Sequence, residues 1–325
     1  MARRNVVSAL NLALDREMAR NERIVLLGED VGGEGGVFRV TEGLQEKYGA
    51  QRVVDTPLAE AGIVGTALGL ALGGMLPVPE IQFEGFLYPA LNQLCNHIAR
   101  YRTRTRGGRP VQLVLRCPWG GGIHAPEHHS DAPEALLAHT PGLTVVTPSS
   151  PYDAKGLLTA ALRHPDPVVF CEPKRIYRAV KQEVPEEDYL VPIGKAAVVR
   201  EGRDATVVAW GALVREALGA ADLLAEEGVS AEVVDLRTLA PLDGETVAAS
   251  VRKTGRLVVA HEAPRTCGLG AELAARVAED CLTDLLAPVV RVTGFDTVVP
   301  LAKLEHHYLP DAKRIAAGVR RAVRF

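Results

Sequence analysis

The chain has 325 residues, which is enough for two domains with buried cores. Hydrophobic residues make up 47% of it and charged residues 24%, the proportions of an ordinary globular protein. The net charge of −3 gives no reason to expect nucleic acid or an anionic membrane as a partner.

The five cysteines are scattered and form no Cys-x-x-Cys pair, which favours reduced thiols in a cytoplasmic protein over disulfides or zinc. Residues 1–20 lack the apolar run of a secretory signal and are expected to form an amphipathic helix. Residues 61–79 are uncharged and long enough to raise the question of a membrane span. Their glycines, their two prolines and the absence of a Trp/Tyr belt argue against one.

Short apolar runs alternate with helical patterns through the first half of the chain. We expect strands at residues 24–27, 52–54, 78–82, 111–116, 144–147 and 168–172, and a helix at 89–101. This alternation predicts a doubly wound parallel sheet.

An acidic, proline-containing stretch at 181–193 has the composition of a linker. Beyond it the alternation restarts, with strands at 206–210, 231–236, 257–260 and 289–292 and helices at 214–227, 244–253 and 271–286. The sequence therefore predicts an α/β protein of two doubly wound domains, residues 1–180 and a smaller one at 194–325, joined by the linker 181–193.

The stretch from Asp55 to Phe86, DTPLAEAGIVGTALGLALGGMLPVPEIQFEGF, is the centre of the first domain. Its glycines and alanines at three- and four-residue spacing predict a helix that another backbone can approach closely. We expect this helix to be apolar and buried all round, with Glu60 in its first turn. A first-turn carboxylate often only complements the helix dipole. Beside a long apolar wall, however, a carboxyl group can also hold or pass a proton near neutral pH.

Other candidate residues lie in loops after strands. Glu29 follows the first buried strand, at the carboxyl end where ligands gather in open α/β sheets. The loop CPWGGGIHAPEHHSDAP at 117–133 contains His124, His128 and His129. Its spacing supplies no third metal ligand, so a zinc site is disfavoured. Two interpretations of these histidines remain. They are surface residues without a role, or they act in acid–base or electrostatic catalysis near neutral pH.

The motifs DTPLAEAGIVG and PEIQFEGF, with GEDV at 28–31 and HHYLP at 306–310, strongly resemble a known family. They resemble β subunits of the E1 component of thiamine-diphosphate-dependent 2-oxo acid dehydrogenases, which are transketolase-like proteins, and the resemblance runs nearly end to end. It implies that Glu60 hydrogen-bonds N1′ of the cofactor's aminopyrimidine and so helps the 4′-nitrogen remove the thiazolium C2 proton. The cofactor carries the hard chemistry, and the protein supplies position and electrostatics.

The resemblance also implies contacts with the rest of the cofactor. Phe86 would stack against the aminopyrimidine, although core packing is the ordinary role of a phenylalanine. Glu29 and Gln82 would contact the cofactor, and Leu58 and Ala59 would lie beside it through their backbone. Gln82 is otherwise an ordinary half-buried strand residue.

For the histidine loop, the resemblance implies that His129 positions the 2-oxo acid and later helps reductive acylation of the lipoyl group. It gives His128 no role. The turn LRHPDP resembles one that presents backbone carbonyl oxygens to a potassium ion, although an ordinary loop between helix and strand would look the same. The implied potassium ligands are Leu113, Ala161, Leu162, His164 and Asp166.

The sequence lacks the GDG motif and downstream asparagine that hold Mg²⁺ and the diphosphate in thiamine-diphosphate enzymes; residues 28–30 are the nearest match. An anionic diphosphate needs the metal for charge neutralisation. We therefore expect an α subunit that holds Mg²⁺, in an α2β2 tetramer. The resemblance further implies that the C-terminal domain docks the subunit-binding domain of the E2 acyltransferase, whose lipoyl domain accepts the acyl group.

Pyruvate is the expected substrate, because GGGIHAPEHHSD and QFEGF resemble pyruvate enzymes. CEPKRIYRAV is closer to branched-chain enzymes, which makes 2-oxoisovalerate the alternative. A nicotinamide-dependent oxidoreductase is a distant alternative, since the best glycine pattern, at 268–270, has Leu273 where its third glycine should be. A non-catalytic scaffold would be indicated by loss of Glu60 or His129, and both are present.

Overall fold

The computed structural model describes residues 2–325, which form two compact units. The first unit comprises the residues up to 119 and residues 136–193, and the second comprises 120–135 and 194–325. The second unit thus includes the segment that carries the three histidines His124, His128 and His129.

The first unit is built on a parallel sheet. Its strands lie in the order β6-β7-β5-β4-β2-β3, and every neighbouring pair is parallel. Their residues are mostly buried on both faces, which explains the nearly continuous apolar runs in the sequence. The predicted strands are confirmed, with ends displaced by up to three residues: β2 (Ile24–Gly28), β3 (Val53–Asp55), β4 (Leu76–Glu80), β5 (Val114–Trp119), β6 (Thr144–Val146) and β7 (Val168–Pro173).

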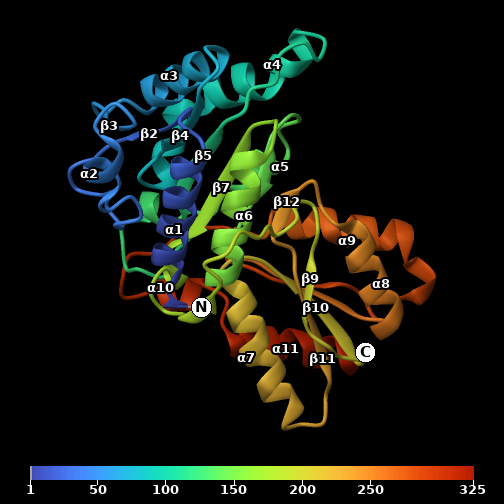
Figure 1. Ribbon diagram of the computed structural model, residues 1–325. Coiled ribbons are helices and arrows are strands. Elements are labelled where there is room, and N and C mark those ends of the chain that lie inside the picture. Colours follow the sequence, from blue (N-terminus) through green and yellow to red (C-terminus); the bar gives the residue numbers. More distant parts are fainter. Residues whose placement is uncertain (1) are drawn as a thin grey trace. The chain divides into compact units, whose positions relative to one another are not determined.

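Helices α1 (Val6–Arg20) and α6 (Pro151–Arg163) pack against each other in front of these strands (Figure 1). Asn5 caps α1 through a reciprocal pair of hydrogen bonds with Ser8. Ser150 caps α6, with Pro151 in its first turn. The remaining short helices before residue 140 are α2 (Leu44–Tyr48), α4 (Ala99–Arg104), η3 (Glu127–His129) and α5 (Glu134–Ala138).

The helix predicted at 89–101 is a different structure. A 3₁₀ helix, η1 (Glu84–Ala90), is followed by a π-helical segment, η2 (Asn92–Ile98), and then by α4. Pro89 explains part of the difference, because proline lacks the N–H that an α-helix interior needs.

Helix α3 (Glu60–Leu72) forms where the sequence predicted it, but it is not buried all round. Its buried side consists of Glu60, Ile63, Val64 and Ala67. The opposite side is exposed in this chain and consists of Gly62, Thr66 and Gly69, continuing to Gly73. The expectation of complete burial was wrong because the glycine face meets no other part of the first unit.

The segment predicted as a linker folds back onto the first unit. Within it, β8 (Gln182–Val184) pairs antiparallel with β1 (Ala2–Arg4). The buried amine of Lys155 donates to the carbonyls of Pro185 (2.7 Å) and Glu187 (2.6 Å). After β7, a 3₁₀ turn, η4 (Lys174–Ile176), precedes this segment.

The second unit has a sheet with the order β14-β13-β10-β11-β9, in which β9 is antiparallel and the other strands are parallel. Helices α7 and α11 lie on one face of this sheet and α8 and α9 on the other (Figure 1). The predicted fold class, two α/β domains with parallel-sheet cores, is confirmed. The strands are β9 (Ala197–Arg200), β10 (Ala205–Ala209), β11 (Ala231–Asp235), β12 (Thr238–Ala240), β13 (Leu257–Ala260) and β14 (Val290–Val292). The helices are α7 (Leu213–Ala225), α8 (Gly244–Thr254), α9 (Leu269–Asp280), η5 (Leu282–Asp284), α10 (Glu305–Tyr308) and α11 (Ala312–Val323).

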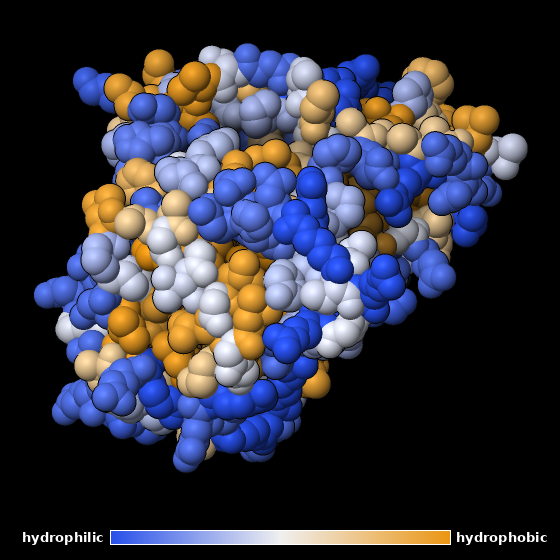
Figure 2. All heavy atoms as spheres, turned by 90° about the horizontal axis from the view of Figure 1, so that it is seen from above, coloured by the Kyte–Doolittle hydropathy of each residue, from blue (hydrophilic) through white to orange (hydrophobic). Residues whose placement is uncertain are grey.

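In residues 2–325 we find no helix with the length and apolar character needed to cross a bilayer. Hydrophobic residues nevertheless reach the surface in several patches (Figure 2). Exposed apolar side chains include Leu58, Tyr88, Val298 and Phe325.

Candidate active site

The candidate site of the first unit lies where three parallel strands end. Strand β2 pairs with both β3 and β4, so that Gly28, Asp55 and Glu80 stand in register at one edge of the sheet. Parallel strands present their carboxyl ends at the same edge, and ligands of open α/β sheets bind there. The segments that follow these strands carry the predicted residues Glu29, Leu58, Ala59, Glu60, Gln82 and Phe86.

Glu60 is the first residue of α3 and is buried, with 8% of its surface exposed. Ala59, which precedes it, makes no side-chain cap to the helix, so the positive end of the helix dipole faces Glu60. Within residues 2–325, no side chain donates a hydrogen bond to the Glu60 carboxylate. This carboxylate can therefore accept a hydrogen bond from water or from a ligand.

Glu29 lies close enough to Glu60 for the two charges to interact. Burial raises the pKa of Glu29, and the neighbouring carboxylates of Glu60 and Asp30 raise it further. The Gln82 amide donates to Asp30 (2.9 Å) and to the Glu29 carbonyl (3.4 Å), which ties the end of β4 to the end of β2. The structure therefore brings together Glu29, Glu60 and Gln82.

The glycine-rich loop after Glu29 is held by Asp55 at the end of β3. The Asp55 carboxylate accepts hydrogen bonds from the backbone of Gly32 (2.6 Å) and Gly33 (3.1 Å). A Cβ atom on Gly32 would lie 2.1 Å from the Gln45 amide nitrogen and 2.6 Å from an Asp55 oxygen, so a larger residue would have to displace these side chains.

Phe86 lies in η1, half-buried, next to a small aromatic cluster. Its ring meets that of Phe83 edge-on at 6.1 Å, and Phe83 meets Phe38 edge-on at 5.5 Å. Phe38 in turn contacts Tyr177, with ring centroids 5.0 Å apart. Phe86 is therefore held by neighbouring rings and is not a fully buried core residue.

Leu58 and Ala59 occupy the turn before α3, and both are exposed. Leu58 keeps 79% of its surface accessible, which is unusual for a large apolar side chain in a turn that adjoins a buried carboxylate. This exposure leaves the Leu58 side chain free to contact a ligand or another chain.

A buried ionic network supports the strand ends from behind. Arg116 in β5 donates to Glu80 in β4 (2.6 Å) and, through two bonds, to Glu172 in β7 (2.6 and 3.0 Å). The Tyr177 hydroxyl donates to Glu172 (2.6 Å). Burial alone would lower the pKa of Arg116, but Glu172 and Glu80 together raise it, so the guanidinium stays charged. Sequence patterns gave no signal for this network, because its charged residues lie inside runs that otherwise look like core strands.

The predicted residue His129 lies in the second unit, at the end of η3, and is half-buried. Its ring stands edge-on to that of His128, with centroids 4.2 Å apart, and its backbone N–H donates to Pro126 (2.9 Å). His128 is exposed, as is His124, whose backbone is left-handed (φ 60°).

Two acidic residues of the second unit, which the sequence analysis did not identify, accept hydrogen bonds from the backbone of the histidine loop. The buried carboxylate of Glu305 accepts from the backbone of Gly122 (2.7 Å) and His124 (3.0 Å), and lies 3.0 Å from the His124 ring. Glu262 accepts from the backbone of Gly121 (3.1 Å). Both acids bind backbone N–H groups more than a hundred positions away, and no residue-type pattern shows such a contact.

The five predicted potassium ligands lie in the first unit, and three of their carbonyls already accept a hydrogen bond. The Leu113 carbonyl accepts from Val168 (2.9 Å), and the Leu162 carbonyl accepts from the Gln112 amide (3.0 Å). The Ala161 carbonyl accepts from the backbone of His164 (3.1 Å), whose ring accepts from the backbone of Asp166 (3.2 Å). Each carbonyl has a second lone pair, so these contacts leave room for a cation without defining one.

Comparison with known proteins agrees with the class that the two folded units define. Residues 3–180 match the pyrimidine binding domain of transketolase, and residues 194–315 match the transketolase C-terminal domain. A solved structure of a split-gene transketolase, an inactive β4 tetramer, superposes with a TM-score of 0.82 at 26% identity and covers 98% of both chains. The chain is thus a transketolase-like protein.

Its relatives narrow this class. The chain is 56% identical to the pyruvate dehydrogenase E1 component subunit beta of Acholeplasma laidlawii, over 99% of this chain and 98% of the relative. It is 49% identical to the subunit of that name from Bacillus subtilis and 50% identical to that of Staphylococcus epidermidis, over the full length of both chains in each case. The chain belongs to the family of pyruvate dehydrogenase E1 β subunits, and the resemblance drawn from its motifs is confirmed.

Proposed function

We propose that this chain is the β half of an E1 enzyme that decarboxylates pyruvate and passes the acetyl group to a lipoyl group of E2. The observation that carries the proposal is the buried Glu60 carboxylate at the start of α3, which has no donor of its own within the described residues. The names of the full-length relatives support pyruvate as the substrate. The branched-chain 2-oxo acid is the alternative outcome of the test below.

The residues at the strand ends fit the aminopyrimidine of thiamine diphosphate. Glu60 would accept a hydrogen bond from the pyrimidine ring and hold the proton there, and Phe86 would give the ring an apolar surface to lie against. Glu29 and Gln82 would line the same edge, and the exposed Leu58 would be covered. When bound, the cofactor supplies a carbanion-stabilising centre that these residues cannot provide themselves.

The same residues do not fit the diphosphate. The strand ends present the acidic groups Glu29, Asp30, Asp55 and Glu60, which would repel a diphosphate. This supports an α2β2 assembly in which an α subunit holds the diphosphate and Mg²⁺. The open glycine face of α3 and the exposed Leu58 are surfaces that such a partner would cover.

His129 would act on the substrate and not on the cofactor. A neutral imidazole near physiological pH can orient the carboxylate of the 2-oxo acid and exchange a proton with the lipoyl sulfur. The Glu305 and Glu262 contacts hold the loop backbone on which His129 stands. The proposal also includes a potassium ion, bound by backbone carbonyls of Leu113, Ala161, Leu162, His164 and Asp166. We expect the enzyme to work in the cytoplasm.

The test is decarboxylation with a dye acceptor, using this chain co-expressed with its α subunit. Pyruvate is compared with 2-oxoisovalerate at saturating thiamine diphosphate and Mg²⁺. We expect a preference for pyruvate and a loss of about 10²- to 10⁴-fold in kcat for Glu60→Gln, which keeps the shape of the side chain and removes its charge. Glu22→Gln, at an exposed position, is the matched control and should keep full activity.

Three outcomes separate the parts of the proposal. A preference for 2-oxoisovalerate would support the proposed enzyme class but show that pyruvate is not its substrate. Equal activity of Glu60→Gln and the wild type would refute the role of Glu60. Tight binding of thiamine diphosphate and Mg²⁺ by the isolated chain would refute the need for an α subunit.

A further inference from the structure

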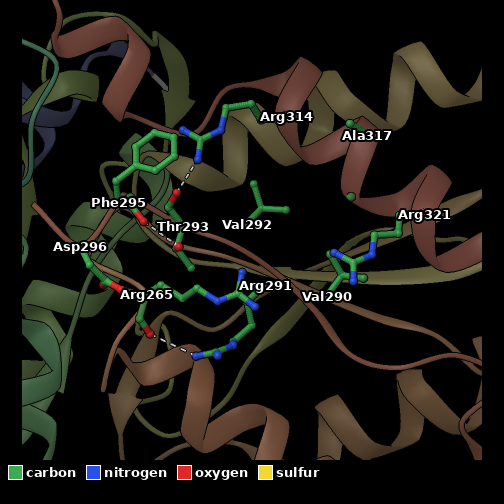
Figure 3. Close-up of a pocket in the computed structure, with 12 residues that line it drawn as sticks. Arg265, Val290, Arg291, Val292, Thr293, Phe295, Asp296, Arg314, Ala317 and Arg321 are labelled. Atoms are coloured by element: carbon green, nitrogen blue, oxygen red, sulfur yellow. Dashed lines mark hydrogen bonds between the residues drawn. The ribbon is translucent and has the colours of Figure 1, made fainter.

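A cavity of about 430 Å³ opens in the second unit between the edge strand β14 and helix α11 (Figure 3). Val290 and Val292 form an apolar part of its lining, and Ala317 contributes a small side chain from α11. Its volume falls within the range of sites that hold small ligands. None of the residues proposed for catalysis lines it.

Four arginines from three separate segments line this cavity. Arg265 follows β13, Arg291 lies in β14, and Arg314 and Arg321 project from α11. The one acidic lining residue is Asp296, whose carboxylate accepts from the backbone (2.8 Å) and hydroxyl (2.7 Å) of Thr266. Four guanidinium groups and one carboxylate give the cavity a formal charge of +3, in a chain whose net charge is −3.

Within residues 2–325 these arginines form no close ion pair, although the charges of Arg265 and Asp296 interact inside the cavity. Arg320, the neighbour of Arg321 on α11, pairs with Glu227. In residues 2–325, by contrast, none of the four cavity arginines lies within 4.0 Å of a carboxylate oxygen. Asp296 offsets one of the four positive charges, and the repulsion among the others costs free energy.

Neutral groups hold two of the side chains in place. Arg291 donates to the carbonyl of Arg265 (3.1 Å), and Arg314 donates to those of Tyr308 (2.8 Å) and Thr293 (2.5 Å). Figure 3 shows the bonds from Arg291 to Arg265 and from Arg314 to Thr293. Carbonyls fix the direction of a guanidinium and leave its positive charge available. Burial lowers the pKa of Arg314, against the influence of Asp311 and Tyr308, so part of its hydration is already lost before a ligand arrives.

We propose that this cavity is a binding site for a small phosphate-bearing ligand of nucleotide size. The planar fork of arginine matches phosphate oxygens with paired hydrogen bonds, and arginines from several directions can bind more than one phosphate group. The valines give an apolar surface for the rest of the ligand. Phe295, which is 53% exposed with Arg314 4.8 Å from its ring, adds an aromatic face at the edge.

The form of the site favours a small molecule over an acidic segment of a protein partner. Protein interfaces are broad, and their charged residues lie mostly at the rim. Here the guanidinium groups line one hollow of limited volume that has apolar walls. Ligand sites likewise combine a few orienting polar groups with apolar walls.

The experiment measures binding of a fluorescent ADP analogue, mant-ADP, to the α2β2 enzyme by fluorescence anisotropy. Thiamine diphosphate and Mg²⁺ are kept saturating so that the cofactor site is filled. Unlabelled ADP, pyrophosphate and adenosine are the competitors. We expect ADP and pyrophosphate to displace the probe and adenosine to fail, with affinity falling as salt is raised.

Variants locate the binding. Arg291→Gln combined with Arg321→Gln should weaken probe binding at least about tenfold, because two charge-assisted contacts are lost. Arg265→Gln changes an exposed side chain and should weaken probe binding by a smaller factor. This variant tests the proposal if the double variant fails to fold. Arg320→Gln, whose arginine is paired with Glu227 outside the cavity, is the control and should bind as the wild type does.

Several results would overturn the proposal. Unchanged affinity in both the double variant and Arg265→Gln would place the probe elsewhere, and failure of pyrophosphate to compete would remove the phosphate requirement. Binding by the isolated chain but not by α2β2 would show that the assembly covers the cavity. Displacement of the probe by a glutamate-rich peptide at lower concentration than ADP would assign the cavity to a protein partner. None of these measurements uses decarboxylation, so they are independent of the proposed function.

Discussion

The carboxylates of Glu60 and Glu29 lie at the same edge of the sheet but have different electrostatic surroundings. Glu60 stands at the positive end of a helix, whereas Glu29 lies at the end of a strand, beside Glu60 and Asp30. Burial and the two neighbouring carboxylates raise the pKa of Glu29, so this acid binds a proton more readily than a free carboxyl group does.

Glu29 gives a prediction about pH. Its pKa is raised in the folded chain, by burial first and then by Glu60 and Asp30, so the folded chain binds more protons than the unfolded chain between the two pKa values. Its contribution to stability therefore falls as pH rises through that window. Glu29→Gln should raise the Tm at pH 7 by on the order of 1 °C, with the difference gone near pH 4.

Thermal unfolding at the two pH values measures this effect. Glu22→Gln, at an exposed position, is the control and should leave the Tm unchanged at both. A stabilisation by Glu29→Gln that is larger at pH 4 than at pH 7 would contradict the assigned direction of the shift.

Arg116 gives a prediction about stability. It is 1% exposed and is the cation between the buried carboxylates of Glu80 and Glu172. Arg116→Met keeps much of the volume and leaves both carboxylates buried without a counter-charge, which typically costs about 3–5 kcal/mol. We expect a loss of that size in the free energy of unfolding, measured by urea denaturation.

The exposed ion pair between Arg320 and Glu227 is the matched comparison. Arg320→Met should cost less than about 1 kcal/mol, because solvent screens a surface pair. Similar losses in the two variants would mean that the buried network contributes no more than a surface contact. Recovery of the Arg116→Met variant at acidic pH, where the carboxylates take up protons, would support the electrostatic explanation.

Among the secondary-structure elements, those that the sequence predicted well are buried strands with continuous apolar runs, such as β2, β7 and β13. Short edge strands were missed: β1 and β8 are three residues each, and β9 has four residues, none of them buried. Pairing partners far away in the sequence define such strands, and composition does not show them. Helix α6 was overlooked although Ser150 and Pro151 are clear start signals.

The candidate site was predictable to the extent that it depends on chain-local patterns. A carboxylate at the start of a glycine-rich helix identified Glu60, and a polar residue after a buried strand identified Glu29. Glu262 and Glu305 were not predictable, because their role depends on loop backbone atoms that the fold brings to them. The exposure of one face of α3 was also missed, since a pattern of small residues shows that a close approach is possible but not which chain makes it.

Helix α3 carries the prediction about assembly. A Cβ atom on Gly69 would meet no atom within 4 Å in this chain, so Gly69→Leu should leave the isolated chain folded and add about 0.5–1 kcal/mol through helix propensity. If the glycine face packs against a backbone of another subunit, the same leucine prevents that approach. We expect the variant to have an equal or higher Tm alone and to assemble poorly with the α subunit in sedimentation velocity experiments.

Ala225→Leu, at an exposed position of α7, is the control for adding a leucine to a helix surface. It should leave the tetramer intact. Normal assembly of Gly69→Leu would show that the glycine face stays open in the complex, and a fall in the Tm of the isolated chain would show that the face is not free in the monomer.

At the scale of the whole molecule, the chain combines one unit with acidic strand ends, where we propose part of an active site, and a second unit that contains the histidine loop. Each has its own sheet and core, and the acids at the strand ends of the first unit are unsuited to a diphosphate. A chain built in this way depends on partners, and its surface should carry residues that serve them and not the fold. The C-terminus is the clearest case, because α11 ends at Val323 and Phe325 beyond it is 81% exposed.

The two residues after α11 therefore give a prediction that separates docking from catalysis. Deleting Arg324 and Phe325 leaves Ile315, Val319 and Ala322 in their buried positions, so the fold should be unchanged. An exposed terminal aromatic is the kind of side chain that contributes strongly to an interface. We expect binding of the E2 subunit-binding domain, measured by calorimetry, to weaken about tenfold or more, while decarboxylation with the dye acceptor stays at the wild-type rate. Phe325→Ala should reproduce most of the loss if the ring is responsible. Loss of both binding and decarboxylation would show that the terminus supports the enzyme itself, and unchanged binding would place the E2 contact on another surface.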